Sequence, residues 1–335
     1  MTRLSVLDLA PITEGSTAEQ SFKNSVELAQ LAEKLGYHRY WLAEHHNIPG
    51  IASAATAVLL AYVGAKTNKI RIGSGGVMLP NHAPLIIAEQ FGTLASLYPD
   101  RIDLGLGRAP GTDGITAQAL RRSFNGSVDN FPRDVLELQQ YFADPEPGQC
   151  VQAVPGAGLN VPLWILGSSL YGAELAAHFG LPYAFASHFA PTDLKHALHL
   201  YRQNFKPSQQ LDKPYVMAAM NLQAADTRKE ADVIVTSLMQ GVLGLSRGMP
   251  IKLPPPVDGF AEKLGHQETA AISRFMTYTA LGDAKDVKER LRDFQSETGA
   301  DEIILTAQIF DHQARLHAFE IAAEAMEMLS KSASA

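Results

Sequence analysis

The chain has 335 residues, of which 46% are hydrophobic and 19% charged, so it can bury one large core and shows no compositional sign of disorder. The formal net charge is −7 and no stretch concentrates Lys and Arg; we therefore expect neither a nucleic acid nor a membrane as partner. Cys150 is the one cysteine, which excludes an intramolecular disulfide and fits the cytoplasm. The first apolar run is interrupted by Asp8 and Pro11 and is too short for a signal or membrane segment.

Eight short apolar segments rich in β-branched or aromatic residues predict strands. In chain order they are 3–9, 38–43, 70–74, 102–106, 162–166, 183–187, 215–222 and 302–306. Nine segments with apolar residues at helical spacing predict helices at 18–36, 52–65, 84–97, 129–142, 170–179, 192–204, 226–240, 285–298 and 312–330. Apolar strands separated by helices indicate parallel pairing. Eight such units favour a single α/β domain over 1–335, a closed (β/α)8 TIM barrel, over an open sheet.

Inserted loops are expected at the C-terminal mouth of the barrel, and three segments exceed plain βα units; of these, 241–266 follows the seventh predicted strand and would lie at that mouth. Segments 107–128 and 144–161 flank the fourth helix, and the second is typical of a turn or hairpin. Segment 241–266 contains several glycines and three consecutive prolines, which argue against a helix or a central strand. Long loops at a barrel mouth are often lids; a surface excursion is the alternative.

Glu44, His45 and His46 follow the second predicted strand. A metal site is disfavoured because neighbouring residues on a strand point to opposite faces and no further ligand motif completes the set. A histidine at a strand end could instead donate a hydrogen bond or a proton near neutral pH. Alternatively, one of the two histidines has a structural role and forms hydrogen bonds with neighbouring side chains at the rim of the barrel.

Glycines and small polar residues follow the next strands. The segment 73–90, "GSGGVMLPNHAPLIIAEQ", has three glycines in four residues, which suit either a closely approaching flat ligand or a tight turn. The segment 102–114, "IDLGLGRAPGTDG", departs from the dinucleotide-binding spacing. Its Arg108 fits a phosphate or a salt bridge. Ser168 and Ser169 could cap a helix or bind an anion at its N-terminus. Because Arg108 follows the adjacent predicted strand, it favours a single phosphate pocket formed together with these two serines.

These stretches, in this order, resemble the bacterial luciferase-like flavin monooxygenase family. The resemblance covers nearly the whole chain and rests on "AEHH", "RIGSGGVMLPNHAPLIIAEQFGTLASLYPDRIDLGLGR" and "GSSLYGAELAAHFGLPYAFASHF". It implies a (β/α)8 barrel that holds FMN by its phosphate at the C-terminal mouth. Gly107 stands where bacterial luciferase has a reactive cysteine, and Ser168 where it has a carboxylate.

The resemblance also implies roles for single residues. The phosphate ligands are Arg108, Ser168 and Ser169, with Gly172 lining the same pocket. A non-proline cis peptide joins Gly75 and Gly76 beneath the flavin ring, and Glu89 is a carboxylate near the flavin. His45 is the catalytic histidine, and Glu44 and His46 complete the expected catalytic set.

The activity implied by the family is oxygenation of a small organic substrate. Reduced FMN, supplied by a separate NAD(P)H-dependent flavin reductase, would react with O2 to form a flavin peroxide that transfers one oxygen atom. The family is often homodimeric. The alternatives are a flavin-binding protein without oxygenase activity, an enzyme that uses the deazaflavin F420 for hydride transfer and, at a distance, a metal-dependent hydrolase. Apolar side chains expected near the mouth suggest a partly apolar pocket: Phe185, Phe189, Leu243 and Leu245.

Overall fold

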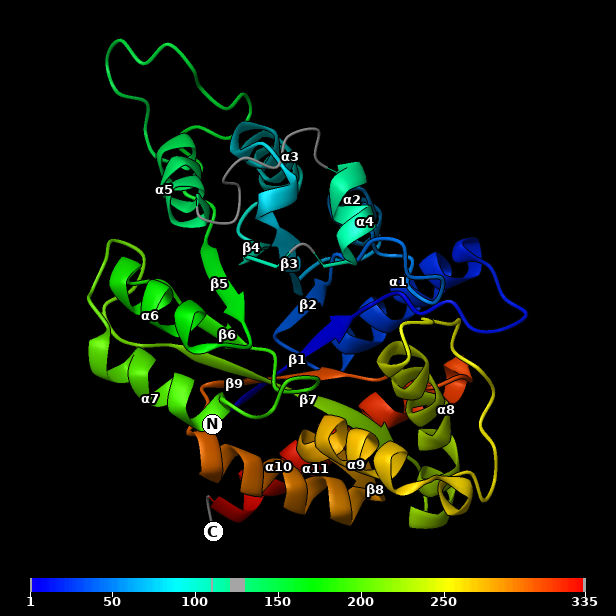
Figure 1. The fold of residues 1–335 in the computed structure, drawn as a ribbon. Coiled ribbons are helices and arrows are strands. Elements are labelled where there is room, and N and C mark those ends of the chain that lie inside the picture. Colours follow the sequence, from blue (N-terminus) through cyan, green and yellow to red (C-terminus); the bar gives the residue numbers. More distant parts are fainter. Residues whose placement is uncertain (1, 110, 121–129, 334–335) are drawn as a thin grey trace.

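The computed structural model describes residues 2–109, 111–120 and 130–333. Every one of the eight predicted strands is present, and together they form a closed ring of parallel strands surrounded by helices (Figure 1). The ring consists of β1 (Arg3–Asp8), β2 (Arg39–Leu42), β3 (Arg71–Met78), β4 (Ile102–Gly107), β5 (Leu163–Gly167), β6 (Tyr183–Phe185), β7 (Val216–Ala224) and β9 (Glu302–Thr306). Pairing of β7 with both β6 and β9, and of β9 with β1, closes it. The predicted (β/α)8 TIM barrel is confirmed.

Alternate side chains of the strands fill the interior of the ring, as expected when successive residues of a strand face opposite sides. Five of them, from five different strands, form an apolar layer: Leu7, Trp41, Trp164, Met217 and Ile304. The rings of Trp41 and Trp164 meet edge to face, with centroids 5.1 Å apart. The intervening side chains point outward and form the larger core beneath the helices.

A network of buried charges closes the barrel at the N-terminal ends of the strands. Arg39 donates to Glu302 (3.0 Å) and to Asp103 (2.7 Å), and Arg71 donates to Asp103 (2.6 Å). Burial alone would raise the pKa of Asp103, but the two guanidinium groups hold it below its usual range. The Arg39 guanidinium also lies 4.7 Å from the ring centre of Trp164. Charges buried in this way persist because each has a partner.

All nine predicted helices are present, to within a few residues, in the part of the chain that the structure describes. They are α1 (Ala18–Lys34), α2 (Thr56–Gly64), α3 (Pro84–Leu97), α5 (Phe131–Phe142), α6 (Leu170–Phe179), α7 (Leu194–Asn204), α8 (Arg228–Ser246), α10 (Ala284–Thr298) and α11 (His312–Ala333). None of the described helices is both long and apolar enough to cross a membrane. Short elements that were not predicted are α4 (Gly114–Leu120), α9 (His266–Phe275), β8 (Thr279–Gly282) and the 3-10 turns η1 (Leu79–Asn81), η2 (Ala261–Lys263) and η3 (Met276–Tyr278).

The expectation that 241–266 contains no helix is wrong at its start, because α8 continues to Ser246. Each glycine inside a helix costs only about 1 kcal/mol relative to alanine, and α8 is long and amphipathic. Gly244 also permits a close approach, since a Cβ there would lie 2.9 Å from the carbonyl oxygen of Met249. The chain leaves the helix at Gly248, whose φ is +69°. Segment 144–161 forms turns, as predicted, and extends beyond α5 (Figure 1).

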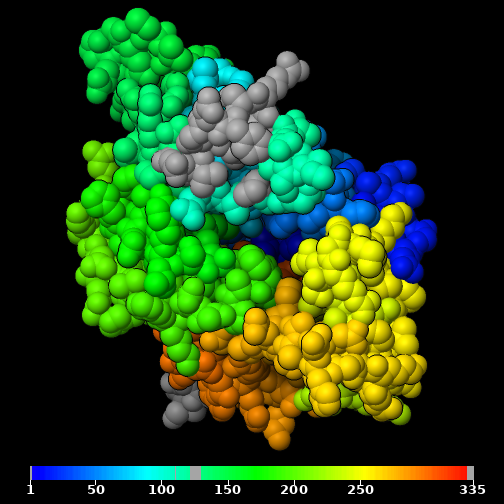
Figure 2. All heavy atoms as spheres, in the orientation of Figure 1, coloured from blue at the N-terminus to red at the C-terminus, as the bar shows by residue number. Residues whose placement is uncertain are grey.

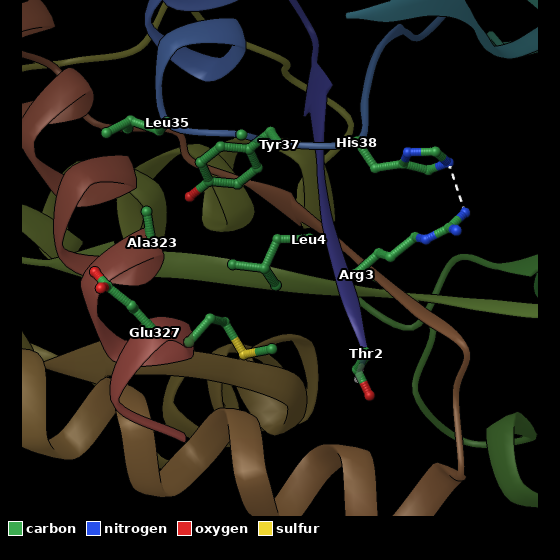
Figure 3. Close-up of a pocket in the computed structure, with 10 residues that line it drawn as sticks. Thr2, Arg3, Leu4, Leu35, Tyr37, His38, Ala323 and Glu327 are labelled. Atoms are coloured by element: carbon green, nitrogen blue, oxygen red, sulfur yellow. Dashed lines mark hydrogen bonds between the residues drawn. The ribbon is translucent and has the colours of Figure 1, made fainter. Parts of the chain in front are cut away.

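A surface hollow of about 510 Å³ lies at the closed, N-terminal end of the barrel (Figure 3). Arg3, Tyr37, His38 and Glu327 are among the residues that line it. The Arg3 guanidinium donates to Nε2 of His38 across 3.0 Å. The predicted site residues follow the C-terminal ends of their strands, so this hollow lies at the opposite end of the barrel.

Candidate active site at the barrel mouth

The loops that follow β2, β3, β4 and β5 carry most of the predicted site residues. Because the strands of the ring are parallel, their C-terminal ends share one end of the barrel, where barrel enzymes bind their substrates. Figure 2 shows a hollow at this end, between the green segment that follows β6 and the yellow segment that follows α8, with blue residues of the first strands behind it. Three features lie at this mouth. They are the buried carboxylate of Glu44, here called the carboxylate clamp, the bend at Gly75 and Gly76, and Arg108 beside the start of α6.

Glu44 is 2% exposed and joins two loops. Its Oε1 accepts hydrogen bonds from Nε2 of His46 and Nε2 of His82, both across 2.8 Å, and its Oε2 accepts one from the backbone N–H of Met78 across 3.1 Å. Burial alone would raise the pKa of Glu44, but these partners hold it below its usual value. The ionised carboxylate therefore ties the loop after β2 to the turn after β3. The sequence analysis did not assign His82 to this cluster.

His45 is not among the hydrogen-bond partners of Glu44. Its Nδ1 is buried, and no donor or acceptor of the described residues lies within hydrogen-bond reach of it. Burial lowers the pKa of His45, and the neighbouring charge of Glu44 opposes this only in part. His45 is thus a neutral imidazole at physiological pH. His45 and His46 do not share one target, and within the described ranges no group of three side chains is placed to hold a metal ion.

The peptide bond between Gly75 and Gly76 is cis, which confirms that expectation. Neither glycine has room for a side chain: a Cβ on Gly75 would lie 2.7 Å from Cδ1 of Leu7, and one on Gly76 would lie 2.7 Å from the carbonyl oxygen of Gly105. The register of β3 against β4 shifts at this point, between Ser74 and Val77. Close packing against Leu7 and Trp41 accounts for Gly75, and close packing against β4 accounts for Gly76; their role beneath a flavin stays a prediction.

Arg108 is exposed at the end of β4, and its guanidinium carbon lies 4.1 Å from the ring centre of Tyr171, in the first turn of α6. The salt bridge considered for Arg108 is not found among the described residues. Ser169 is the N-cap residue of α6, but its hydroxyl makes no capping bond. Free N–H groups of a first helical turn attract anions. A cation, a free hydroxyl and a helix start therefore converge here.

Gly172 brings the start of α6 close to the end of β5. Its Cα is buried against Gly167, and a Cβ added to Gly172 would lie 3.4 Å from the Tyr183 ring and 3.7 Å from Cα of Gly167. The Tyr183 hydroxyl donates to the carbonyl of Ser169 across 3.2 Å, which fixes the strand-to-helix turn. Ser168 lies in the same turn and is partly buried.

Glu89 is less clearly part of the mouth. It lies in α3, is partly buried, and its backbone carbonyl accepts the Thr93 hydroxyl across 2.8 Å. No hydrogen bond or ion pair found in the described residues joins the Glu89 carboxylate to the other predicted site residues. Its proximity to a flavin stays a prediction.

Two of the four apolar side chains expected at the mouth belong to the core instead. Phe185 is 1% exposed and packs in the core beneath the helices, and Leu243 packs between α8 and α9. The error arises because sequence position near a strand end does not reveal which face a side chain occupies. Phe189 and Leu245 are 49% and 56% exposed, so both remain available to a ligand.

The segment after α8 is docked against the first two βα loops. Leu253 exchanges backbone hydrogen bonds with Ile12 (3.0 Å) and Glu14 (2.8 Å). Lys252 donates through its Nζ to the carbonyl of Ser16 across 3.0 Å. Gly50 permits this contact, because a Cβ there would lie 2.5 Å from the carbonyl oxygen of Ile251. The docked segment borders the hollow seen in Figure 2.

Sequence reasoning gave no role to three further residues at this end: Tyr171, His188 and Asn221. His188 is buried in the turn after β6, and the side-chain amide of Asn221, on β7, donates to the His188 carbonyl across 2.6 Å. Burial, and to a smaller extent a charge on His45, lowers the pKa of His188 to about 3. The sequence signal that could have indicated a role for His188 is its position directly after the sixth predicted strand.

Comparison with known proteins places the whole chain in one family. The family model for luciferase-like monooxygenases matches residues 2–318. A luciferase-like monooxygenase of Escherichia coli (strain K12) is 56% identical over 325 residues, which cover 97% of this chain and 97% of that protein. The crystal structure of apo-MsnO8 is 35% identical, superposes with a TM-score of 0.86, and covers 98% of this chain and 99% of its own.

Two more distant structures share the fold alone. One is the oxygenating constituent of a diketocamphane monooxygenase from Pseudomonas putida in complex with FMN, at 17% identity and a TM-score of 0.70, over 96% of this chain and 97% of its own. The other is an F420-dependent secondary alcohol dehydrogenase, at 15% identity and a TM-score of 0.70, over 97% of this chain and 98% of its own. From the family model and the 56% identical relative, the chain belongs to the luciferase-like monooxygenase family.

Proposed function

We propose that this monooxygenase uses FMN, receives it in reduced form from a separate NAD(P)H-dependent flavin reductase, and oxygenates a small organic substrate with O2. Family membership supports the reaction type. The observation that carries the choice of cofactor is the Arg108 guanidinium stacked on Tyr171 beside the start of α6. A planar cation beside the free N–H groups of a helix suits a terminal phosphate.

At the phosphate end, the chain's own residues fit FMN. Arg108 would pair with the phosphate, and Tyr171 would hold the guanidinium in one orientation. The hydroxyls of Ser168 and Ser169 and the first N–H groups of α6 would donate to the remaining phosphate oxygens, since the Ser169 hydroxyl is not used as a cap. Gly172 keeps the helix start close to β5.

At the other end of the cofactor, Gly75 and Gly76 would border the flat ring of FMN, as the family resemblance implies. Bound FMN would supply the electrons and the site at which O2 is activated. His45, as a neutral imidazole, can donate a hydrogen bond or a proton to the reacting oxygen. Glu44 is buried and already accepts three hydrogen bonds, so we assign it, with His46, to positioning the His45 loop. The docked segment 247–260 would act as a lid that excludes water.

The test is anaerobic titration with reduced FMN and, separately, with reduced F420, followed by exposure to O2 and a panel of organic compounds. The proposal expects tighter binding of FMN than of F420, followed by an oxygenated product. Tighter binding of F420 would favour hydride transfer, and FMN binding without any product would favour a flavin-binding protein. Stoichiometric consumption of NADH by the purified chain alone would contradict the separate reductase.

We further propose that the protein is a homodimer and works in the cytoplasm beside its reductase. Apolar side chains are exposed on the outer faces of α2 and α3, which pack side by side: Val58 at 72%, Tyr62 at 43% and Ile86 at 48%. Exposed apolar patches often mark protein interfaces. Light scattering after size exclusion is expected to give a dimer for the wild type and a monomer for Val58→Glu; a monomeric wild type would contradict the proposal.

A further inference from the structure

Two histidines reach the barrel mouth from opposite sides of the ring. His45 follows β2 and His188 follows β6, and in the ring order β1-β2-β3-β4-β5-β6-β7-β9 these two strands stand across from each other. An eight-stranded barrel has an interior only wide enough for side chains. Side chains that approach the mouth from these two opposite strands can therefore act on one small ligand.

The backbone that carries His188 is held by buried polar side chains. The Ser187 hydroxyl donates to the carbonyl of Ala219 across 2.6 Å, and the Asn221 amide donates to the carbonyl of His188 across 2.6 Å. Ser187 and Asn221 are almost completely buried. The His188 ring also meets the Phe189 ring edge to face, with centroids 4.9 Å apart. The position of the His188 ring is thus fixed from both sides.

Both rings carry a nitrogen that the protein does not satisfy. Nδ1 of His45 and Nδ1 of His188 are buried, and neither has a hydrogen-bond partner among the described residues. Leaving a buried polar atom unpaired costs about 1–3 kcal/mol, and such atoms are uncommon in folded proteins. A ligand that hydrogen-bonds to these rings would remove part of that cost.

The surroundings determine which ligand fits. Burial lowers the pKa values of both histidines, so neither ring offers a positive charge, and the ionised Glu44 lies beside His45. Among the described residues no cationic side chain is bonded to either unpaired nitrogen, so an anionic group would gain no counter-charge from these contacts and would pay the desolvation cost. Leu9, Ala43 and Ala219 belong to the buried apolar cluster inside the barrel. The site suits an apolar molecule with one uncharged polar group.

We propose that His188 is a substrate-binding residue which, together with His45, hydrogen-bonds the polar group of a neutral organic substrate such as a ketone. This inference rests on the proposed function, because it places the substrate at the mouth assigned to FMN. His188 determines specificity by favouring uncharged polar groups over carboxylates.

The test uses the full chain labelled with ¹⁵N at its histidines, with oxidised FMN bound, titrated with methyl hexyl ketone or with octanoate. The ketone should shift the ring nitrogen resonances of His188 and His45. It should bind about ten times more weakly to His188→Phe, the loss of roughly one hydrogen bond. Unmoved resonances, a ketone affinity of His188→Phe within twofold of wild type, or tighter binding of octanoate would overturn the proposal.

Controls separate binding from folding and from cofactor loss. Phenylalanine fills the space of the imidazole and removes the unpaired nitrogen, so the variant should keep its melting temperature. If His188→Phe does not fold, the proposal is tested by the ketone affinity of His188→Leu and by the resonance shifts of the wild type. His38→Phe, at the closed end of the barrel, should leave ketone affinity unchanged. The same titration without FMN distinguishes the two proposals: a wild type that fails to bind FMN contradicts the proposed function, whereas unmoved His188 resonances contradict this one.

Discussion

Arg108→Ala should weaken FMN binding while leaving riboflavin binding unchanged. A hydrogen bond to a charged group contributes about 1.5–3 kcal/mol, which corresponds to a factor of roughly 10–150 in affinity. Because Arg108 is exposed, solvent and salt screen its charge, so we expect the lower end, about tenfold. Flavin fluorescence titration measures both affinities. Riboflavin lacks the phosphate and therefore reports the ring end of the site alone.

A matched control is Arg290→Ala, since Arg290 also lies over a tyrosine, with its guanidinium carbon 5.6 Å from the ring centre of Tyr278. It should change neither affinity. Tyr171→Phe keeps the stacked ring and should retain FMN affinity, whereas Tyr171→Ala should lose part of it. The reasoning is refuted if Arg108→Ala weakens riboflavin and FMN equally, because the arginine would then support the fold of the mouth and not the phosphate.

Three further outcomes follow from single side chains. His45→Asn should lower oxygenase turnover by about a hundredfold or more and keep FMN affinity; full turnover would contradict its catalytic role. Asp8→Asn should lower the free energy of unfolding by about 3 kcal/mol, because it leaves the buried guanidinium of Arg315, now bonded to Asp8 across 2.6 Å, without its counter-charge. Burial alone would raise the pKa of Asp8, but Arg315 and hydrogen bonds hold it below the ordinary 3.8. This stability is therefore present above about pH 4 and lost as the pH falls through the folded-state pKa, and urea unfolding at several pH values should show a flatter profile for the variant. Gly76→Ala should cost about 1–3 kcal/mol through overpacking, whereas Gly114→Ala, whose Cβ would meet nothing within 4 Å, should melt near the wild type; equal melting of the two variants would refute the packing argument.

The barrel could be predicted from sequence because each strand and helix carries its own periodicity. α4 has only seven residues, too few for a helical repeat to stand out, and β8 is an additional strand that pairs with β7 outside the ring; both were missed. α9 lies directly after the proline-rich stretch that indicated a loop. Part of segment 107–128 lies outside the described residues.

Several predicted site residues follow the strand ends at the mouth, but the contacts that they make could not be predicted. The separation of His45 from His46 followed from the alternation of a strand. The contact between Glu44 and His82 could not be predicted, because His82 lies 38 residues away in the chain and no local pattern reports a contact between two loops. The same reason applies to His188, whose position opposite the His45 loop depends on closure of the ring. The stacking of Arg108 on Tyr171 likewise depends on how the fold brings the end of β4 to the start of α6, which the sequence pattern does not report.

The charged network at the closed end of the barrel has a consequence for how this protein can change over time. Arg39, Asp103 and Glu302 satisfy one another and anchor strands on different sides of the ring. The predicted site residues follow the opposite ends of the strands, so this network does not depend on the side chains that the loops at the mouth carry. Proteins with this arrangement can change substrate through substitutions in the loops at the mouth, while the buried ion-pair network at the closed end stays the same.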